Sequence, residues 1–174
     1  MEKRKVSWDE FQGLVAKICR EIANSDWRPD YIVGITRGGL LPAVMISQYF
    51  NVPCETLKVS LRDHGGENPT ESNLWMAEDA FGYEMDKPKN ILIVDDINDT
   101  GATVNWILED WPSGCFPLNE ERWGNVFSNN VRFATVFDNL ASKANVKMSY
   151  VGEEINKAER DVWIDFPFED WWTK

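Results

Sequence analysis

Three carboxylic acids and a glycine-containing turn follow the most apolar segment of the sequence, residues 90–94. Asp95 and Asp96 come directly after this segment, Asp99 comes three residues later, and residues 100–103, Thr-Gly-Ala-Thr, open a helical pattern. Backbone N–H groups at such a turn, together with the two threonine hydroxyls, form an anion site that suits a phosphate. The carboxylates would be repelled by that phosphate unless they face sugar hydroxyls, a divalent cation or a developing positive charge. A phosphorylated sugar with free hydroxyls meets both demands.

A second candidate ligand-binding turn consists of Arg37, Gly38 and Gly39, which follow the apolar segment 31–36. An arginine between a buried strand and two glycines favours contact with an anion, because the guanidinium is always charged and carries five N–H donors. The glycines let the backbone approach the ligand closely. Plainer interpretations exist for each motif, since paired acids often end a strand and Thr-Gly sequences often form simple turns.

The spacing of apolar side chains predicts the elements that position these residues. Residues 7–24 carry apolar side chains three and four positions apart, with Ser7 as N-cap and Glu10 three residues on, which predicts an amphipathic helix. A strand, a glycine turn and a helix over 40–50, with Pro42 in its first turn, then follow in the order of a parallel α/β unit. We predict further strands at 54–60, 90–94, 131–137 and 148–151, a helix that ends at Pro112, and a strand or loop over 161–172.

These elements predict a single domain, residues 1–174, of the α/β class. We expect a mostly parallel sheet flanked by helices, with the ligand at the carboxyl ends of the strands and a small C-terminal hood over about 152–174. Two stretches show little periodicity. We predict a flexible loop over about 61–89, and an irregular insertion over about 112–130 that serves either as a subunit contact or as a lid.

The composition argues against several classes of function. Eighteen basic residues against twenty-nine acidic ones give a net charge of −11, which argues against a protein that binds nucleic acid through its phosphates. The apolar runs are too short to cross a bilayer and the first residues lack a signal-peptide core, so we expect neither membrane insertion nor secretion. Cys19, Cys54 and Cys115 form no CxxC pair and suit a reducing cytoplasm. A single histidine, His64, excludes a histidine-rich zinc site.

The segment 93–103, IVDDINDTGAT, resembles the phosphoribosyl-pyrophosphate loop of the type I phosphoribosyltransferases. Further segments agree in order with the xanthine-guanine and hypoxanthine branch of that family: VSWD at 6–9, GITRGGLLP at 34–42, DVWI at 161–164 and FPFE at 166–169. Together they span nearly the whole chain. The resemblance implies an enzyme that uses Mg²⁺ and phosphoribosyl pyrophosphate, and we also expect a homo-oligomer, either a dimer or a tetramer.

The resemblance implies a role for each residue that matches the sugar-phosphate motifs. Asp95 and Asp96 would bind the ribose hydroxyls, directly or through Mg²⁺, and Asp99 would be the general base near N7 of a purine. The backbone and hydroxyls of Thr100, Gly101, Ala102 and Thr103 would hold the 5′-phosphate, and Arg37, Gly38 and Gly39 would hold the pyrophosphate. Carboxylates placed there would stabilise the positive charge that develops on the sugar as pyrophosphate leaves.

The base-binding residues follow the family less closely. Trp163 would stack on the purine, although burial in the core is an equally good and compatible role, and the carbonyls of Trp163 and Ile164 would face the N1–C2 edge. The family branch carries a lysine two residues after the phenylalanine that ends the fourth core strand, where it reads the 6-oxo group. Here Phe137 is followed by Asp138 and Asn139, and the nearest lysine is Lys143. Either Lys143 reaches the base or the base preference differs.

The combined motifs predict a purine phosphoribosyltransferase that converts guanine, xanthine or hypoxanthine to its nucleotide and releases pyrophosphate. Its partners would be these small molecules, without nucleic acid or membrane. The alternatives are transfer to another base, such as a pyrimidine, and a catalytically silent regulatory protein that binds phosphoribosyl pyrophosphate or a nucleotide. Asp99 favours the enzyme, because a protein that only binds needs no proton acceptor there.

Overall fold

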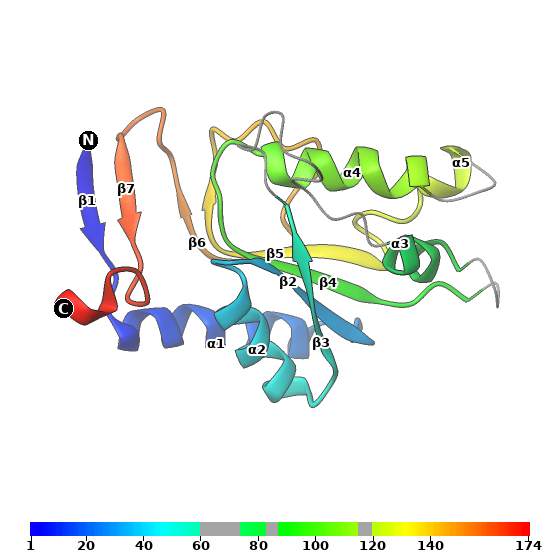
Figure 1. Ribbon diagram of the computed structural model, residues 1–174, viewed down its shortest axis with the longest axis horizontal. Helices are drawn as coiled ribbons and strands as arrows, with labels where there is room; N and C mark the ends of the chain where they lie inside the picture. The colour runs from blue at the N-terminus through cyan, green and yellow to red at the C-terminus, as the bar shows by residue number, and fades with distance from the viewer. Residues whose placement is uncertain (60–73, 83–86, 115–119) are drawn as a thin grey trace.

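The computed structural model describes residues 1–59, 74–82, 87–114 and 120–174 (Figure 1). Its described part contains a five-stranded parallel sheet of order β3-β2-β4-β5-β6 and a separate parallel pair, β1 with β7. The elements in chain order are β1 (Glu2–Lys5), α1 (Trp8–Asn24), β2 (Tyr31–Thr36), α2 (Leu40–Phe50), β3 (Cys54–Lys58), α3 (Leu74–Phe81), β4 (Ile91–Asn98), α4 (Ala102–Gly114), α5 (Glu120–Trp123), β5 (Val131–Asn139), β6 (Tyr150–Ile155), β7 (Val162–Asp165) and the 3₁₀ turn η1 (Trp171–Thr173).

Helices cover both faces of the central sheet, which confirms the predicted fold class. Figure 1 shows α1 and α2 below the sheet and α4 and α5 above it. The strands β2 and β4 are buried over the segments Tyr31–Ile35 and Ile91–Val94, as expected for strands covered on both faces. The helix α1 begins as predicted, because the Ser7 hydroxyl accepts the Glu10 N–H at 3.1 Å and Phe11, Val15 and Ile18 turn toward the core.

The layer above the sheet contains structure where the sequence suggested loops. Within the predicted loop 61–89, Met76, Ala77, Ala80 and Phe81 are buried along one face of α3. Their spacing of one, three and four residues is typical of one face of a helix. The pattern covers only a few residues, so the sequence of this polar segment did not predict a helix. The remainder of that predicted loop, 60–73 and 83–86, lies outside the described residues.

The predicted insertion 112–130 also contributes to the core. The helix α4 continues through Pro112 to Gly114, and the buried Trp123 stacks near Phe81 and Phe127, with ring centroids 5.5 and 5.8 Å away. These aromatic contacts make the described part of the segment a packing element of the sheet rather than an irregular surface feature. Residues 115–119 lie outside the described part.

The ends of the sheet differ from the prediction in ways that matter for the site. The strand β4 runs on to Asn98, so Asp95 and Asp96 lie within the strand rather than after it. The strand β6 covers the start of the predicted hood but pairs with β5 in the central sheet. The hood therefore starts near Val162, and its strand β7 pairs with β1, a polar strand that the sequence pattern did not indicate.

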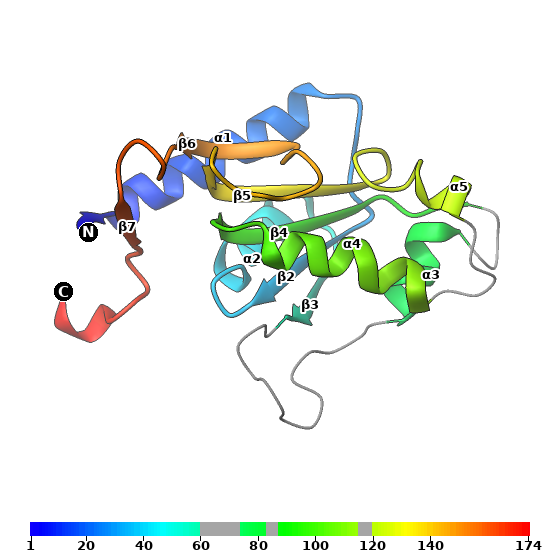
Figure 2. The same cartoon turned by 90° about the horizontal axis from the view of Figure 1, so that it is seen from above.

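The hood lies at one end of the molecule. Figure 2 shows β1, β7 and the C-terminal turn at one end of the central sheet, and α3 and α5 at the other. Phe166 joins the hood to the rest of the core, because its ring packs edge-on against Phe11 and Phe137, with centroids 6.2 and 5.7 Å away. None of the described helices is both long and apolar enough to cross a membrane.

Candidate active site

Two adjacent carboxylates lie near the carboxyl end of β4, at the centre of the sheet. The Asp96 N–H donates to Asp95 Oδ1 at 2.9 Å, and the Ile97 N–H donates to Asp96 Oδ1 at 2.8 Å. Burial raises the pKa of Asp95 well above its ordinary value, and the charge of Asp96 raises it further. Burial likewise raises the pKa of Asp96. Two acids held in this way favour a bound cation or sugar hydroxyls that donate to them.

The turn between β4 and α4 has the shape of an anion-binding site. Gly101 has a φ of +89°, and an added Cβ would overlap the backbone N of Ala144. The first hydrogen bond within α4 runs from the Asn105 N–H to the Gly101 carbonyl, so the N–H groups of residues 102–104 point out of the helix end. The Thr100 hydroxyl accepts the Ala102 N–H at 3.3 Å. A cavity of about 90 Å³ lies at this turn.

The turn after β2 lies beside the same carboxylates. A cis peptide joins Thr36 to Arg37, and a Cβ on Gly38 would overlap the Asp96 carboxylate. A Cβ on Gly39 would overlap the Val94 carbonyl oxygen, so the turn after β2 approaches β4 as closely as only glycine permits. A cavity of about 540 Å³ opens between this turn and the C-terminal segment, lined by Arg37, Gly38, Asp96, Phe168, Glu169, Asp170, Trp171 and Trp172.

A smaller pocket of about 120 Å³ lies between the end of β4 and the hood, lined by Asp96, Ile97, Asp99, Lys157, Trp163, Ile164, Phe166 and Glu169. In β7 the buried Val162 and Ile164 alternate with Trp163, which is 41% exposed. Trp163 therefore points away from the core and toward the pocket. The exposure of its ring differs from the alternative of core burial, and stacking on a base stays a prediction.

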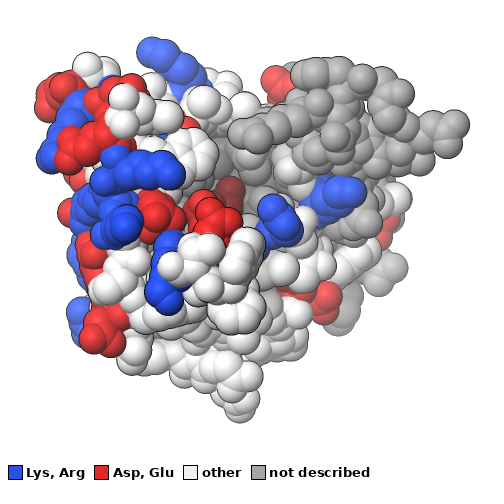
Figure 3. Space-filling model, turned by 60° about the vertical axis from the view of Figure 1, so that its left-hand side comes forward, with Lys and Arg blue, Asp and Glu red and all other residues white. Residues whose placement is uncertain are grey.

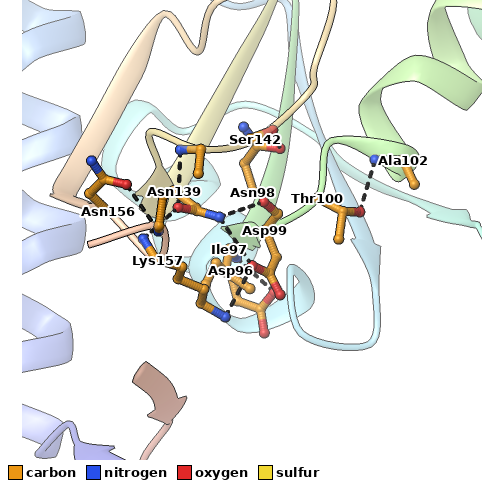
Figure 4. A network of polar contacts seen from close by, with 12 residues as sticks. Asp96, Ile97, Asn98, Asp99, Thr100, Ala102, Asn139, Ser142, Asn156 and Lys157 are labelled. Atoms are coloured by element: carbon orange, nitrogen blue, oxygen red, sulfur yellow. Dashed lines mark hydrogen bonds and ion pairs between the residues drawn. The ribbon is translucent and has the colours of Figure 1, made fainter. Parts of the chain in front are cut away.

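Lys157 extends into this pocket from the connection between β6 and β7. Its Nζ lies 3.0 Å from Asp99 Oδ1 and 5.8 Å from the centroid of the Trp163 ring. Figure 4 shows the Lys157 side chain reaching the Asp99 carboxylate, with Asn139 beside them. The Asn139 amide donates to the Asp99 carbonyl at 2.9 Å and accepts the Lys157 N–H at 3.0 Å. One side chain thus holds the backbone of both charged residues.

Lys143, the lysine proposed from the sequence, occupies a different place. Its backbone N–H donates to the Thr100 carbonyl at 2.8 Å and its carbonyl accepts from the Asn105 amide, while its side chain is exposed. The residues that line the pocket beside Trp163 include Lys157 and not Lys143. The structure places the backbone of Lys143 against residues 100–103, the phosphate-type turn between β4 and α4.

Sequence reasoning missed Lys157, Asn139 and Glu169. Glu169 lines both the larger cavity and the pocket beside Trp163, and burial raises the pKa of its carboxyl. One signal was present, because Asn139 stands where the resembling branch has its lysine, so that another residue would have to supply that cation. No local pattern indicates that Lys157 supplies it.

Comparison with known proteins identifies the family. Residues 7–168 match the model of the phosphoribosyl transferase domain. The chain belongs to the phosphoribosyltransferase family. It is therefore a transferase, and residues of four segments that resemble this family in the sequence, 34–42, 93–103, 161–164 and 166–169, line the cavities described above.

Individual relatives share about a quarter of their residues with this phosphoribosyltransferase. It is 26% identical over 165 residues to the xanthine-guanine phosphoribosyltransferase of Chromohalobacter salexigens, covering 94% of this chain and 82% of the relative. It is 27% identical over 125 residues to xanthine phosphoribosyltransferase 1 of Saccharomyces cerevisiae, covering 63% and 60%. The fold matches a purine phosphoribosyltransferase structure from Pyrococcus horikoshii, with a TM-score of 0.66, 23% identity and coverage of 97% and 95%.

The residues of this phosphoribosyltransferase fit a magnesium ion whose ligands come partly from the substrate. Among the described residues no group of three or more His, Cys, Asp or Glu side chains converges on one point. Mg²⁺ is commonly held by one or two carboxylates, with the other positions taken by water and substrate phosphates. The buried pair Asp95 and Asp96, whose pKa values are raised chiefly by burial, offers such carboxylates.

Acidic and basic side chains alternate on the hood side of the enzyme. In Figure 3 the red and blue groups are interspersed on the described part of this face, and they form no continuous basic surface. Two of the ion pairs are Arg160 with Glu2 and Arg4 with Glu153. Charges of both signs thus lie close together on this part of the surface.

Proposed function

We propose that this phosphoribosyltransferase transfers the phosphoribosyl group of phosphoribosyl pyrophosphate to a 6-oxopurine, with Mg²⁺ as cofactor. The observation that carries the proposal is the position of Asp99. It stands at the start of the phosphate-type turn and also lines the pocket that holds Trp163 and Lys157. One carboxylate thus lies between a place for the sugar phosphate and a place for an aromatic base.

The proposed reaction forms one bond and breaks another at C1 of the ribose. The purine N9 forms a bond to C1, and the C1–O bond to pyrophosphate breaks with its electron pair leaving on the pyrophosphate. The proton on purine N7 passes to the Asp99 carboxylate. A bound Mg²⁺ would neutralise the charge of the leaving pyrophosphate, held by Asp95 or Asp96 together with the substrate oxygens.

Each group of residues in the site would stabilise a different part of the substrates. The N–H groups of residues 102–104 and the Thr100 hydroxyl would bind the 5′-phosphate, and Arg37 with the adjacent glycine backbone would bind pyrophosphate. Asp95 and Asp96 would accept hydrogen bonds from the ribose hydroxyls and stabilise the positive charge that develops on C1. Trp163 would stack on the purine.

The names of the relatives support a purine as acceptor without fixing which one. The curated relatives are named for xanthine and guanine, at 26 to 27% identity. We also propose a cytoplasmic location, because the sequence offers no CxxC pair and its cysteines suit a compartment where thiols stay reduced.

A substrate panel tests the proposal. The protein is incubated with phosphoribosyl pyrophosphate and Mg²⁺ and with guanine, hypoxanthine, xanthine, adenine, uracil or orotate, and nucleotide is measured by chromatography. We expect product with one or more of the three 6-oxopurines and none in excess chelator. If product forms only with a pyrimidine or with adenine, the proposal of a 6-oxopurine as the acceptor is wrong. Binding of phosphoribosyl pyrophosphate without product from any base would favour the regulatory alternative.

A further inference from the structure

A donor and an acceptor stand next to each other in the pocket beside Trp163. The Lys157 ammonium donates and the Asp99 carboxylate accepts, with 3.0 Å between them. The Lys157 side chain is 17% exposed, so most of its length is enclosed by the pocket, whereas Asp99 is 41% exposed. A lysine enclosed to this extent needs a partner, because an unpaired buried charge is costly.

The backbone around this pair is fixed from several directions. Asn139 bonds to the Asp99 carbonyl and to the Lys157 N–H, and it also accepts the Ala141 N–H at 3.1 Å. Asn156 closes the turn that carries Lys157, since its carbonyl accepts the N–H groups of Glu159 and Arg160. Lys157 is therefore presented at a defined point beside Asp99, and its ammonium lies near the Asp99 carboxylate and the Trp163 ring.

The Hoogsteen edge of a purine carries complementary groups at the same kind of spacing. A 6-oxopurine protonated at N7 presents an acceptor, O6, next to a donor, N7–H, whereas adenine presents an amino donor in place of O6. A 6-oxopurine can thus bond to Lys157 through O6 and to Asp99 through N7–H. Adenine would place its amino group against the Lys157 ammonium and leave that charge without an acceptor.

We propose that Lys157 is the residue that selects 6-oxopurines, and that the purine edge replaces the Lys157–Asp99 ion pair. This inference rests on the proposed function. It assigns the recognition of O6 to the β6–β7 connection and not to the residues that follow Phe137, where the chain has Asn139. It also couples recognition to chemistry. The Lys157 ammonium separates from Asp99 only when the purine O6 accepts its hydrogen bond, and the Asp99 carboxylate can then accept the N7 proton.

The test compares Lys157→Met and Lys157→Arg with the control Lys147→Met, which changes an exposed lysine before β6. The kcat/KM values are measured for hypoxanthine and adenine, and the affinities for inosine and adenosine monophosphate are measured by calorimetry. We expect Lys157→Met to lower kcat/KM for hypoxanthine and the affinity for inosine monophosphate on the order of a hundredfold. The adenine compounds should change less than about threefold, and Lys157→Arg should keep the preference for hypoxanthine, because arginine retains a charged donor.

The outcomes separate this inference from the proposed function. Two ratios decide the role of Lys157: kcat/KM for hypoxanthine over that for adenine, and the affinity for inosine monophosphate over that for adenosine monophosphate. If Lys157→Met leaves both ratios unchanged, the role of Lys157 is overturned, even in an active enzyme. Absence of product from the wild type with every base would overturn the proposed reaction, while the nucleotide affinities would still decide the role of Lys157. An unchanged affinity for phosphoribosyl pyrophosphate shows that the variant is folded.

Discussion

Replacement of Gly101 by alanine tests whether the turn before α4 is shaped for a phosphate. Gly101 has a φ of +89°, which side chains other than glycine rarely adopt, and the new Cβ would overlap the backbone N of Ala144. To relieve the overlap, the chain must separate two segments that are joined by the Lys143 N–H to Thr100 carbonyl bond of 2.8 Å. The substitution therefore disturbs the geometry that presents the N–H groups at the turn.

The expected cost follows from these two effects. An unfavourable backbone conformation costs on the order of 1–3 kcal/mol, and loss of a backbone hydrogen bond costs about 1 kcal/mol. In a chain of this size, 1 kcal/mol lowers Tm by about 2–4 °C, so we expect Gly101→Ala to lower Tm by roughly 5–15 °C. We also expect the affinity for phosphoribosyl pyrophosphate to fall by about tenfold or more, since 1.4 kcal/mol of lost binding suffices for that.

Gly13→Ala is the matched control. Gly13 lies within α1, and a Cβ there meets no atom within 4 Å. Alanine in a helix interior is about 0.5–1 kcal/mol more stable than glycine, so this variant should melt slightly higher and bind substrate normally. Calorimetric melting and titration with phosphoribosyl pyrophosphate give both quantities. A Gly101→Ala protein with the Tm and the affinity of the wild type would refute the reasoning about this turn.

Three further substitutions test the other parts of the site. Asp99→Asn should lower kcat on the order of a hundredfold and leave the affinity for phosphoribosyl pyrophosphate within about threefold, because it removes a proton acceptor and little volume; steady-state kinetics with wild-type turnover would contradict its role. Trp163→Ala should raise KM for the base about tenfold, and more than KM for phosphoribosyl pyrophosphate, since stacking on one base contributes about 1–3 kcal/mol; an equal change in both constants would argue against stacking. Asp95→Asn should stabilise the protein at pH 7 in chelator. Because burial raises the folded-state pKa of Asp95, the stability that this group contributes is present below its unfolded pKa and is lost as pH rises through the folded value. The variant should therefore show a flatter dependence of Tm on pH, and an unchanged dependence would rule out Asp95 as its source.

The sequence sufficed for the elements whose signals are local. The helix α1 is defined by its Ser7 cap and the three- and four-residue spacing of its core face, and β2 and α2 by an apolar run, a glycine turn and Pro42. The acidic motif and the phosphate-type turn are contiguous in the sequence, so their residue types indicate their chemistry without a three-dimensional structure. Their roles as ligands stay predictions.

The elements that the sequence did not indicate depend on distant contacts. The strand β1 has the residues Glu-Lys-Arg-Lys and no apolar face, and its pairing partner is β7 at the other end of the chain. The helix α3 has a short apolar face that becomes recognisable once Tyr31 and Trp123 lie against the same layer. Lys157 meets Asp99 because β5 and β6 return the chain to the same edge of the sheet, and no spacing rule encodes that return.

The pairing of β1 with β7 has a consequence for the synthesis of the chain. Glu2, which forms an ion pair with Arg160, leaves the ribosome 158 residues before that partner. At about 5–20 residues per second, β1 waits roughly 8 to 32 seconds for its neighbour. A strand that is unpaired for so long is a template for association with other nascent chains, and charged side chains, lysine above all, discourage such pairing. The four charged residues of β1 keep the early strand solvated until the hood that completes the pocket beside Trp163 has been made.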